Sequence, residues 1–242
     1  MKNKFGFILI KPQLGENIGA CARSLKNFGF SNLRIVSPKQ SWPNNKAKAT
    51  SVGAYDIIKK AKIYNTTHDA IGDFNMVISL SARKRDINKK HISINQFLKI
   101  IKSKKNANFG LMFGPEASGL SNDDLSLSNF VLQIPTSKKF RSLNLSHSLT
   151  LISYEIFKSI NFSKFEKDVK NIKISSKNKI SSLVLHLKKL LEKKGFFIPS
   201  EKKHSMLMNI NNLIYRMEPN DKELRILASI ISSLSKKNIN HN

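Results

Sequence analysis

The chain has 242 residues, 40% of them hydrophobic, so it can bury a full core as one large domain or as one domain with an appendage. Its 42 basic residues outnumber its 16 acidic ones, and the resulting net charge of +26 indicates a polyanionic partner. One cysteine, Cys21, excludes a disulfide framework and a thiolate metal cluster, and no signal peptide or transmembrane run is evident, so we expect a cytoplasmic protein without metal or membrane partners.

The first 160 residues alternate strand-like and helix-like patterns. Short apolar runs predict strands over 5–10, 33–36, 62–64, 76–80, 109–113 and 130–134. Apolar residues at helical spacing predict helices over 18–28, 56–61, 67–74, 93–102 and 144–160, while 12–19 and 37–51 are predicted to be loops. Because strand and helix alternate throughout, we expect an α/β fold with a parallel sheet and helices on both faces.

The composition changes after this region. From 161 to 179 the pattern lapses into Lys, Asn and Ser, which predicts a linker between a domain over 1–160 and a helical appendage over 180–242. The appendage has three helical patterns, at 180–194, 204–217 and 219–237. A unit of about sixty residues is marginal as an independent fold.

Glycine and a carboxylate follow the strand predicted at 109–113. Gly114 and Gly119 let backbone approach a bound molecule, and Glu116 places one carboxylate between them. Ligands of open α/β sheets bind at the carboxyl ends of the strands, so this loop is a candidate site. The same residues also suit an ordinary strand-to-helix turn.

A second polar loop precedes the helix predicted at 144–160. Arg141, Ser142 and Asn144 place a guanidinium, a hydroxyl and an amide where the free N–H groups of a helix favour anions or acceptor-rich ligands. Ser142 or Asn144 can also cap the helix. Capping and ligand contact can coexist, so both interpretations stay open.

The arginines are few and well placed. The chain has 35 lysines and seven arginines, and its abundance of Lys, Ile and Asn also fits composition drift. Four arginines lie beside predicted loops of the sheet domain, namely Arg23, Arg83, Arg85 and Arg141. A guanidinium grips phosphate through two parallel hydrogen bonds, so we interpret these four as phosphate or ribose contacts.

Several enzyme classes lack their motifs. The chain has no phosphate-binding loop for nucleoside triphosphates, no G-x-G-x-x-G and no H-E-x-x-H. His147 has no carboxylate near it in sequence, which favours a structural or solvent-facing role. Polar donors around a glycine-lined crevice on a basic protein suit transfer of a group from a small bound donor to RNA.

Three stretches together resemble the motifs of the SPOUT (SpoU/TrmD) superfamily of RNA methyltransferases. Asn-Ile-Gly-Ala-Cys-Ala-Arg at 17–23 resembles the first motif, and Gly-Pro-Glu-Ala-Ser-Gly-Leu at 114–120 the second. Ile134-Pro135 together with Ser-Leu-Asn-Leu-Ser at 142–146 resembles the third. The resemblance covers 5–160 and implies a trefoil-knotted α/β domain, a homodimer and bound S-adenosylmethionine.

The resemblance also implies roles for individual residues. Arg23 would reach the target ribose, and Glu116, Ser142 and Asn144 would complete the catalytic set. The cofactor would contact Ser79, Leu80, Ser81, Gly114, Gly119, Ile134, Arg141, Ser142 and Leu143. RNA would contact Arg23, Arg83, Arg85, Lys138 and Lys139.

The appendage narrows the resemblance further. Gly195-Phe196-Phe197 and the stretch 223–227 are similar to the tail of the TrmJ type of tRNA 2′-O-methyltransferase. That type implies methylation of a tRNA ribose 2′-hydroxyl, at the anticodon-loop pyrimidine of position 32. The pair Pro115-Glu116 is nearer the wider SpoU branch, so an rRNA 2′-O-methyltransferase is an alternative. A non-catalytic RNA-binding protein with the same fold is another.

Overall fold

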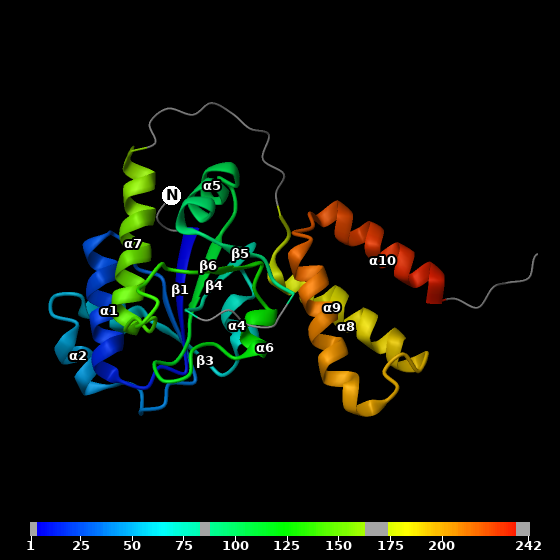
Figure 1. The fold of residues 1–242 in the computed structure, drawn as a ribbon, viewed down its shortest axis with the longest axis horizontal. Coiled ribbons are helices and arrows are strands. Elements are labelled where there is room, and N and C mark those ends of the chain that lie inside the picture. Colours follow the sequence, from blue (N-terminus) through cyan, green and yellow to red (C-terminus); the bar gives the residue numbers. More distant parts are fainter. Residues whose placement is uncertain (1–3, 83–87, 163–173, 236–242) are drawn as a thin grey trace, which may run out of the picture.

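The structure is a computed structural model that describes residues 4–82, 88–162 and 174–235. Its strands are β1 (Phe5–Ile10), β2 (Leu33–Val36), β3 (Lys62–Tyr64), β4 (Met76–Leu80), β5 (His91–Ile92), β6 (Phe109–Phe113) and β7 (Phe130–Leu132). They form one sheet in the order β3-β2-β1-β6-β4-β7-β5, in which every pair of neighbours is parallel (Figure 1). The expected α/β fold with a parallel sheet is confirmed.

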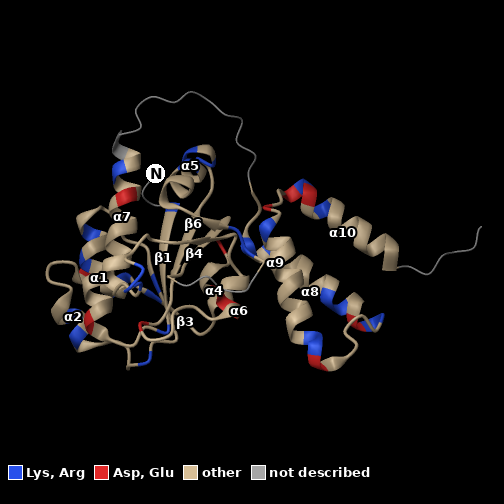
Figure 2. Ribbon diagram, in the orientation of Figure 1, with Lys and Arg blue, Asp and Glu red and all other residues tan. Residues whose placement is uncertain are grey.

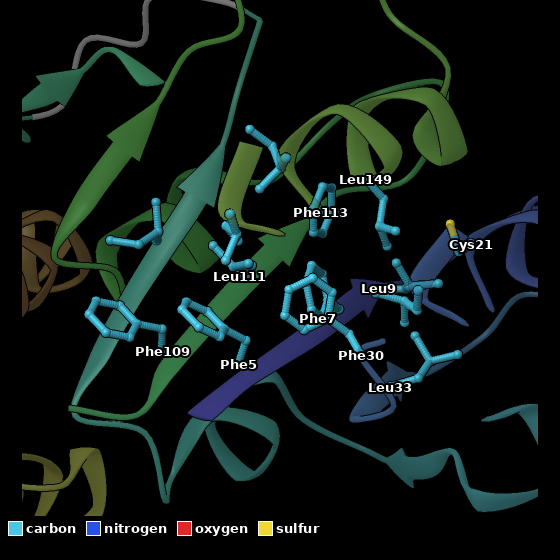
Figure 3. Packing of buried hydrophobic residues seen from close by; sticks show 14 of the residues in the cluster. Phe5, Phe7, Leu9, Cys21, Phe30, Leu33, Phe109, Leu111, Phe113 and Leu149 are labelled. Carbon is cyan, nitrogen blue, oxygen red and sulfur yellow. The ribbon is translucent and has the colours of Figure 1, made fainter. Parts of the chain in front are cut away.

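The larger core lies on one face of the sheet. It is covered by the helices α1 (Gly15–Asn27), α3 (Tyr55–Lys60), α5 (Ile94–Ser103) and α7 (Leu145–Phe162). In Figure 3 the ring of Phe5 on β1 lies beside Phe109 on β6, and the two rings stack with centroids 5.4 Å apart, while Phe7 of β1 lies beside Phe113 of β6. Cys21 of α1 and Leu149 of α7 close this core from the helix side.

The opposite face carries a smaller core. The helices α4 (Thr67–Ile71) and α6 (Asn122–Ser126) cover it. Ile8, Val77 and Met112 point to these helices from three neighbouring strands and are fully buried. Both faces of the central strands are therefore buried, which explains why their sequences are apolar without alternation.

Three further helices form the appendage. They are α8 (Lys177–Lys193), α9 (Lys203–Arg216) and α10 (Asp221–Ser235), with a 3₁₀ turn at Ser200–Lys202. Ile180, Leu183 and Tyr215 lie at the centre of a third buried cluster between these helices. Figure 1 shows the appendage to one side of the sheet domain, beyond α4 and α6.

Hydrogen bonds to backbone groups attach the appendage to the sheet domain of its own chain. The Lys177 N–H donates to the Phe74 carbonyl at 3.0 Å, and the Asn129 amide donates to the Tyr215 carbonyl at 2.7 Å. The Asn75 side chain donates to the carbonyl of Ile174 at 2.6 Å. The appendage thus packs against the α4 and α6 face through buried polar contacts.

The first helix begins earlier than its apolar pattern predicts. The loop expected at 12–19 ends at Leu14, and α1 starts at Gly15. Gly19 lies inside this helix, where a Cβ would come within 2.4 Å of the Ala47 carbonyl oxygen. This glycine permits close packing of two helices, so it does not mark a turn.

The prediction of a loop over 37–51 is wrong in part, because this range contains the helix α2 (Asn45–Thr50). Asn44 caps this helix by accepting a hydrogen bond from the Ala47 N–H at 3.0 Å. A helix of six residues, with only two alanines as apolar residues, is too short to show an apolar period. The five-residue α6 and the two-residue β5 were unpredicted for the same reason.

Other differences concern boundaries. The helix α4 ends at Ile71, before the predicted 74, and β7 ends at Leu132, before the predicted 134. The helix α8 starts at Lys177, inside the range predicted as a linker over 161–179. Most of that range, 163–173, lies outside the described residues.

Candidate active site

A cavity of about 310 Å³ opens at the carboxyl ends of β4, β6 and β7. Three stretches of chain line it, at 80–82, at 113–119 and between 132 and 148. They are the loops that follow three neighbouring parallel strands, so the sheet brings their ends together at one edge. The volume is in the range of cavities that hold small molecules.

The cavity gathers the residues predicted to contact a cofactor, with one exception. It is lined by Leu80, Ser81, Gly114, Gly119, Ile134, Arg141, Ser142 and Leu143. The exception is Ser79, which is fully buried on β4 and does not line the cavity. Its hydroxyl has no hydrogen-bond partner in the part of the chain that the structure describes. Glu116, predicted as catalytic, also lines the cavity.

One side chain of α1 joins the loops of the site. The Asn17 amide nitrogen donates to the Glu116 carboxylate at 2.7 Å, and its oxygen accepts from the Asn144 amide at 3.1 Å. Only 8% of Asn17 is exposed, so water has little access to the amide that makes both hydrogen bonds. The three stretches that carry the motifs are thereby connected through a single buried amide.

The segment before α1 holds the loop that follows β6. The Gln13 N–H donates to the Glu116 carboxylate at 2.9 Å, and the Gln13 side chain accepts from the Ala117 N–H at 3.2 Å. The Glu116 carboxylate therefore receives hydrogen bonds from both backbone and side-chain donors. Hydrogen bonds to a charged acceptor are stronger than those between neutral groups, so these contacts fix the wall of the cavity.

Asn144 has a structural contact as well. Its side-chain oxygen accepts from the backbone N–H of Ser146 at 2.9 Å and from the Ser146 hydroxyl at 2.7 Å, in the first turn of α7. Asn144 thus caps this helix, as the alternative interpretation predicted, while Ser142 lines the cavity. Of the two candidates, the amide orders the helix start and the hydroxyl belongs to the cavity wall.

Of the basic residues predicted to contact RNA, the three that the structure describes lie outside the cavity of a single chain. Arg23 is exposed on α1, about 9 Å along the helix axis from Asn17 at 1.5 Å per residue, and does not line the cavity. Lys138 and Lys139 are exposed in the loop after β7. The predictions for Arg83 and Arg85 lie outside the described residues.

A comparison with known families tests the resemblance that the sequence motifs indicated. A model of the SpoU rRNA Methylase family matches residues 4–154, which contain the seven strands that the structure describes and the three loops of the cavity. The chain belongs to the SpoU methylase family. Membership in the SpoU family confirms the resemblance to SPOUT RNA methyltransferases.

Individual relatives extend the SpoU match to the appendage. The tRNA (cytidine-2′-O-)-methyltransferase TrmJ of Methanocaldococcus jannaschii is 37% identical, over 92% of this chain and 96% of that protein. The tRNA (cytidine/uridine-2′-O-)-methyltransferase TrmJ of Photorhabdus laumondii is 30% identical over 98% of each. The crystal structure of TrmJ from Z. mobilis superposes with a TM-score of 0.87 at 31% identity, covering 96% of this chain and 99% of that one.

Asn17 and Gln13 are the site residues of this SpoU protein that sequence reasoning missed. Asn17 stands at the head of the first motif, but its place in a predicted loop gave no reason to expect a buried amide. The signal was available in the helical period, since Asn17 precedes Cys21 by four residues on the buried side of α1. Gln13 carries no comparable signal.

Two further groups in the SpoU domain have simple roles. Burial raises the pKa of the Cys21 thiol, and the Glu116 charge adds to this effect, so the thiol stays protonated in the core. His147 is exposed on α7, in agreement with a solvent-facing role.

Metal ligands are not clustered in the described ranges. Over residues 4–82, 88–162 and 174–235, no three His, Cys, Asp or Glu side chains are grouped so that they could hold a metal ion. None of the helices described there has the length and apolar character needed to span a membrane.

Proposed function

We propose that this SpoU-family protein methylates a ribose 2′-hydroxyl of tRNA with S-adenosylmethionine, at the anticodon-loop pyrimidine of position 32. The observation that carries the proposal is the meeting of three motif loops at one cavity, in a chain similar to TrmJ proteins over nearly its whole length. The family description names rRNA, but the full-length relatives are named as tRNA enzymes. The similarity of the appendage therefore favours tRNA.

The cavity has the features that S-adenosylmethionine requires. Leu80, Ile134 and Leu143 offer apolar contacts for the adenine ring, and Ser81 and Ser142 offer hydroxyls beside them. Ser79 is next in sequence to this wall, and its buried hydroxyl has no hydrogen-bond partner among the described residues. When bound, the cofactor supplies an electrophilic methyl group on its sulfonium sulfur.

The residues of the chain position the acceptor. Glu116 and Asn144 hold the loops through Asn17, and Ser142 contributes a hydroxyl at the cavity wall. A guanidinium stays protonated in proteins, so Arg23 orients the ribose 2′-hydroxyl and an adjacent phosphate. The hydroxyl proton would leave to water or to a phosphate oxygen as the new O–C bond forms and the sulfur–methyl bond of the donor breaks, with its electron pair left on sulfur.

From the position of Arg23 we infer that the enzyme works as a homodimer. Arg23 does not line the cavity of its own chain, whereas the role inferred from the first motif places it at the ribose. A homodimer that joins the faces of α1 and α7 would bring Arg23 of the partner subunit to this cavity. Leu151 and Tyr154 of α7 are 43% and 44% exposed and supply apolar surface for such an interface.

The charge of the molecule supports an RNA partner. Lys and Arg lie on the helices of both the sheet domain and the appendage (Figure 2). Lys138 and Lys139 flank the cavity loop, and Arg83 and Arg85 follow β4 in the sequence. We assign these four to phosphate contacts. The proposed enzyme acts in the cytoplasm, without a metal ion or a membrane.

The test is methyl transfer to purified RNA. Protein incubated with labelled S-adenosylmethionine and unmodified tRNA is expected to produce an alkali-resistant dinucleotide at position 32, since a methylated 2′-oxygen cannot attack its phosphate. Ribosomal RNA offered in competition tests the alternative substrate, because an rRNA methyltransferase would transfer the label to rRNA in preference to tRNA. Label on a base, or RNA binding without transfer, contradicts the proposal.

A further inference from the structure

Phe140 is exposed beside the cavity. It is 76% exposed, which is the largest exposed fraction among the Phe, Tyr and Trp side chains that the structure describes. Lys138, Lys139 and Arg141 surround it in sequence, and Arg141 lines the cavity. An exposed apolar ring with three cationic neighbours in sequence therefore lies next to a residue of the cavity wall.

Hydrogen bonds within the loop shape this position. The Phe140 N–H donates to the Ser137 carbonyl at 3.2 Å, and the Thr136 hydroxyl donates to the Arg141 carbonyl at 3.3 Å. Thr136 and Arg141 both line the cavity, so the turn between them begins and ends at the cavity wall. Phe140 is thus placed on a turned segment anchored at both ends to the cavity wall.

The surroundings of the ring indicate its partner. Proteins that hold single-stranded nucleic acid combine cations for the phosphates with aromatic rings on which bases stack. Phe140 with its cationic neighbours has this composition at the rim where a ribose must enter. A ring that served only the fold would be covered by its own chain, as Phe113 is at the floor of the same cavity, where it is 2% exposed.

We propose, resting on the proposed function, that Phe140 stacks on the nucleobase of the nucleotide whose ribose is methylated. Lys138 and Lys139 then contact the flanking phosphates, and the base is held outside the cavity while its ribose enters. Stacking uses the face of the base and not its hydrogen-bonding edge. The contact accordingly positions either pyrimidine without choosing between them.

Three variants distinguish the effect of the aromatic ring from the effect of apolar volume at position 140. Phe140→Ala removes the side chain, Phe140→Leu keeps apolar volume without a ring, and Phe140→Tyr keeps the ring. We expect Ala and Leu to lower kcat/KM for tRNA by about 5- to 150-fold, as for loss of one base–aromatic stack, and Tyr to stay near wild type. The matched control is Tyr55→Ala, which removes a 43% exposed ring on α3 and should leave kcat/KM unchanged.

A fluorescent pyrimidine analogue at the target position gives a readout that does not depend on turnover. Wild type and Phe140→Tyr should quench its fluorescence on binding, and Phe140→Ala and Phe140→Leu should not. Equal quenching by all four proteins overturns the stacking proposal even if tRNA is methylated. If wild type binds this tRNA and quenches but transfers no methyl group, the proposed function fails and the stacking contact stands.

Two other roles for the ring are outcomes of the same experiment. If Phe140 covers the cofactor, Phe140→Ala will weaken S-adenosylmethionine binding measured by calorimetry with no RNA present. If it belongs to the contact between two copies of the chain, the variant will change the mass measured by light scattering. Either result overturns the proposal, which expects cofactor affinity and mass to equal those of wild type.

Discussion

Asn17 connects parts of the chain that lie far apart in sequence. It is separated from Glu116 by 99 positions and from Asn144 by 127, yet it forms hydrogen bonds with both. A buried amide that uses both its donor and its acceptor in this way cannot be shortened without leaving partners unpaired. The geometry of the cavity therefore depends on one side chain that does not line it.

We expect Asn17→Ala to lower the free energy of unfolding by about 1–3 kcal/mol, because Glu116 and Asn144 each lose a shielded partner. The affinity for the cofactor should also fall. Without Asn17, the loop at 114–119 keeps its contacts with Gln13 but loses its link to Asn144. Denaturant unfolding and calorimetric titration measure the two effects. Asn27→Ala, at the exposed end of the same helix, is the control. If Asn17→Ala and Asn27→Ala lose the same stability and the same cofactor affinity, Asn17 has no special role in holding the loops.

Arg23 is expected to act on the acceptor and not on the cofactor. Arg23→Ala should lower kcat by about 10²- to 10³-fold, as for loss of one oriented donor, and leave cofactor affinity within about twofold. Single-turnover methylation and calorimetry give these two quantities. Arg225→Ala, an exposed arginine of α10, is the matched control. A parallel fall in cofactor affinity would contradict the assignment.

At the scale of elements, the loop after β6 determines the shape of the cavity. A Cβ on Gly114 would lie 2.3 Å from the Leu120 nitrogen and 2.4 Å from the Gly119 carbonyl carbon. Both are backbone atoms, which cannot rotate away as a side chain does. Gly114 therefore allows the loop to fold back on the end of its strand.

Gly114→Ala should displace this loop and lower affinity for S-adenosylmethionine at least about tenfold, which corresponds to about 1.4 kcal/mol. Calorimetry measures the affinity, and circular dichroism should show the helices unchanged. Gly53→Ala is the control, because Gly53 has a φ of 72° with open space around it and lies outside the cavity. That variant should lose stability through backbone strain and keep cofactor affinity. If Gly114→Ala binds S-adenosylmethionine as tightly as wild type, the prediction is wrong, and the loop adapts to a Cβ at this position without changing the cavity.

At the scale of the whole molecule, buried lysines lie where the appendage joins the sheet domain. Lys177 is 1% exposed and donates to the Asn129 side chain at 2.5 Å, and Lys89 donates to the carbonyls of Ser126 and Ser128. Burial lowers the pKa of each lysine to about 7, and repulsion from Arg216 adds to the shift at Lys89. Each ammonium group is thus less stable here than in water.

The stability of the protein should therefore rise with pH above neutrality. Between pH 7 and the ordinary lysine value of 10.5 the unfolded chain binds more protons than the folded one, so each group contributes a slope of up to about 1.4 kcal/mol per pH unit. Below pH 7 the full cost of burying the charge is present. Urea unfolding at pH 7, 8 and 9 measures this dependence.

Lys177→Met should flatten the dependence, since it keeps the apolar stem and removes the titrating group. Asn129 keeps the hydrogen bond that its oxygen accepts from the Val77 N–H at 2.8 Å, so no new unpaired acceptor arises. Lys222→Met, an exposed lysine of α10, should leave the dependence as in wild type. Equal pH dependence in the two variants would refute the role of Lys177.

The sequence by itself determined the parallel α/β fold and the family. The strands β1, β4 and β6 are apolar on both faces, and this local signal located each of them to the residue. The loops that follow the strands could be recognised as site segments because parallel strands end at a common edge. Motif order then identified SPOUT methyltransferases, a conclusion that periodicity alone would not reach.

Only the tertiary structure decided how those segments are held together. The contacts of Asn17 and of Lys177 join residues distant in the chain, and a pattern that reports local spacing contains no information about them. The short helices α2 and α6 likewise depend on caps and on packing against neighbours more than on an apolar period. Buried polar groups find their hydrogen-bond partners only in the folded chain. The sequence could therefore name many of the residues that line the cavity, but not the side chains that hold its loops in place.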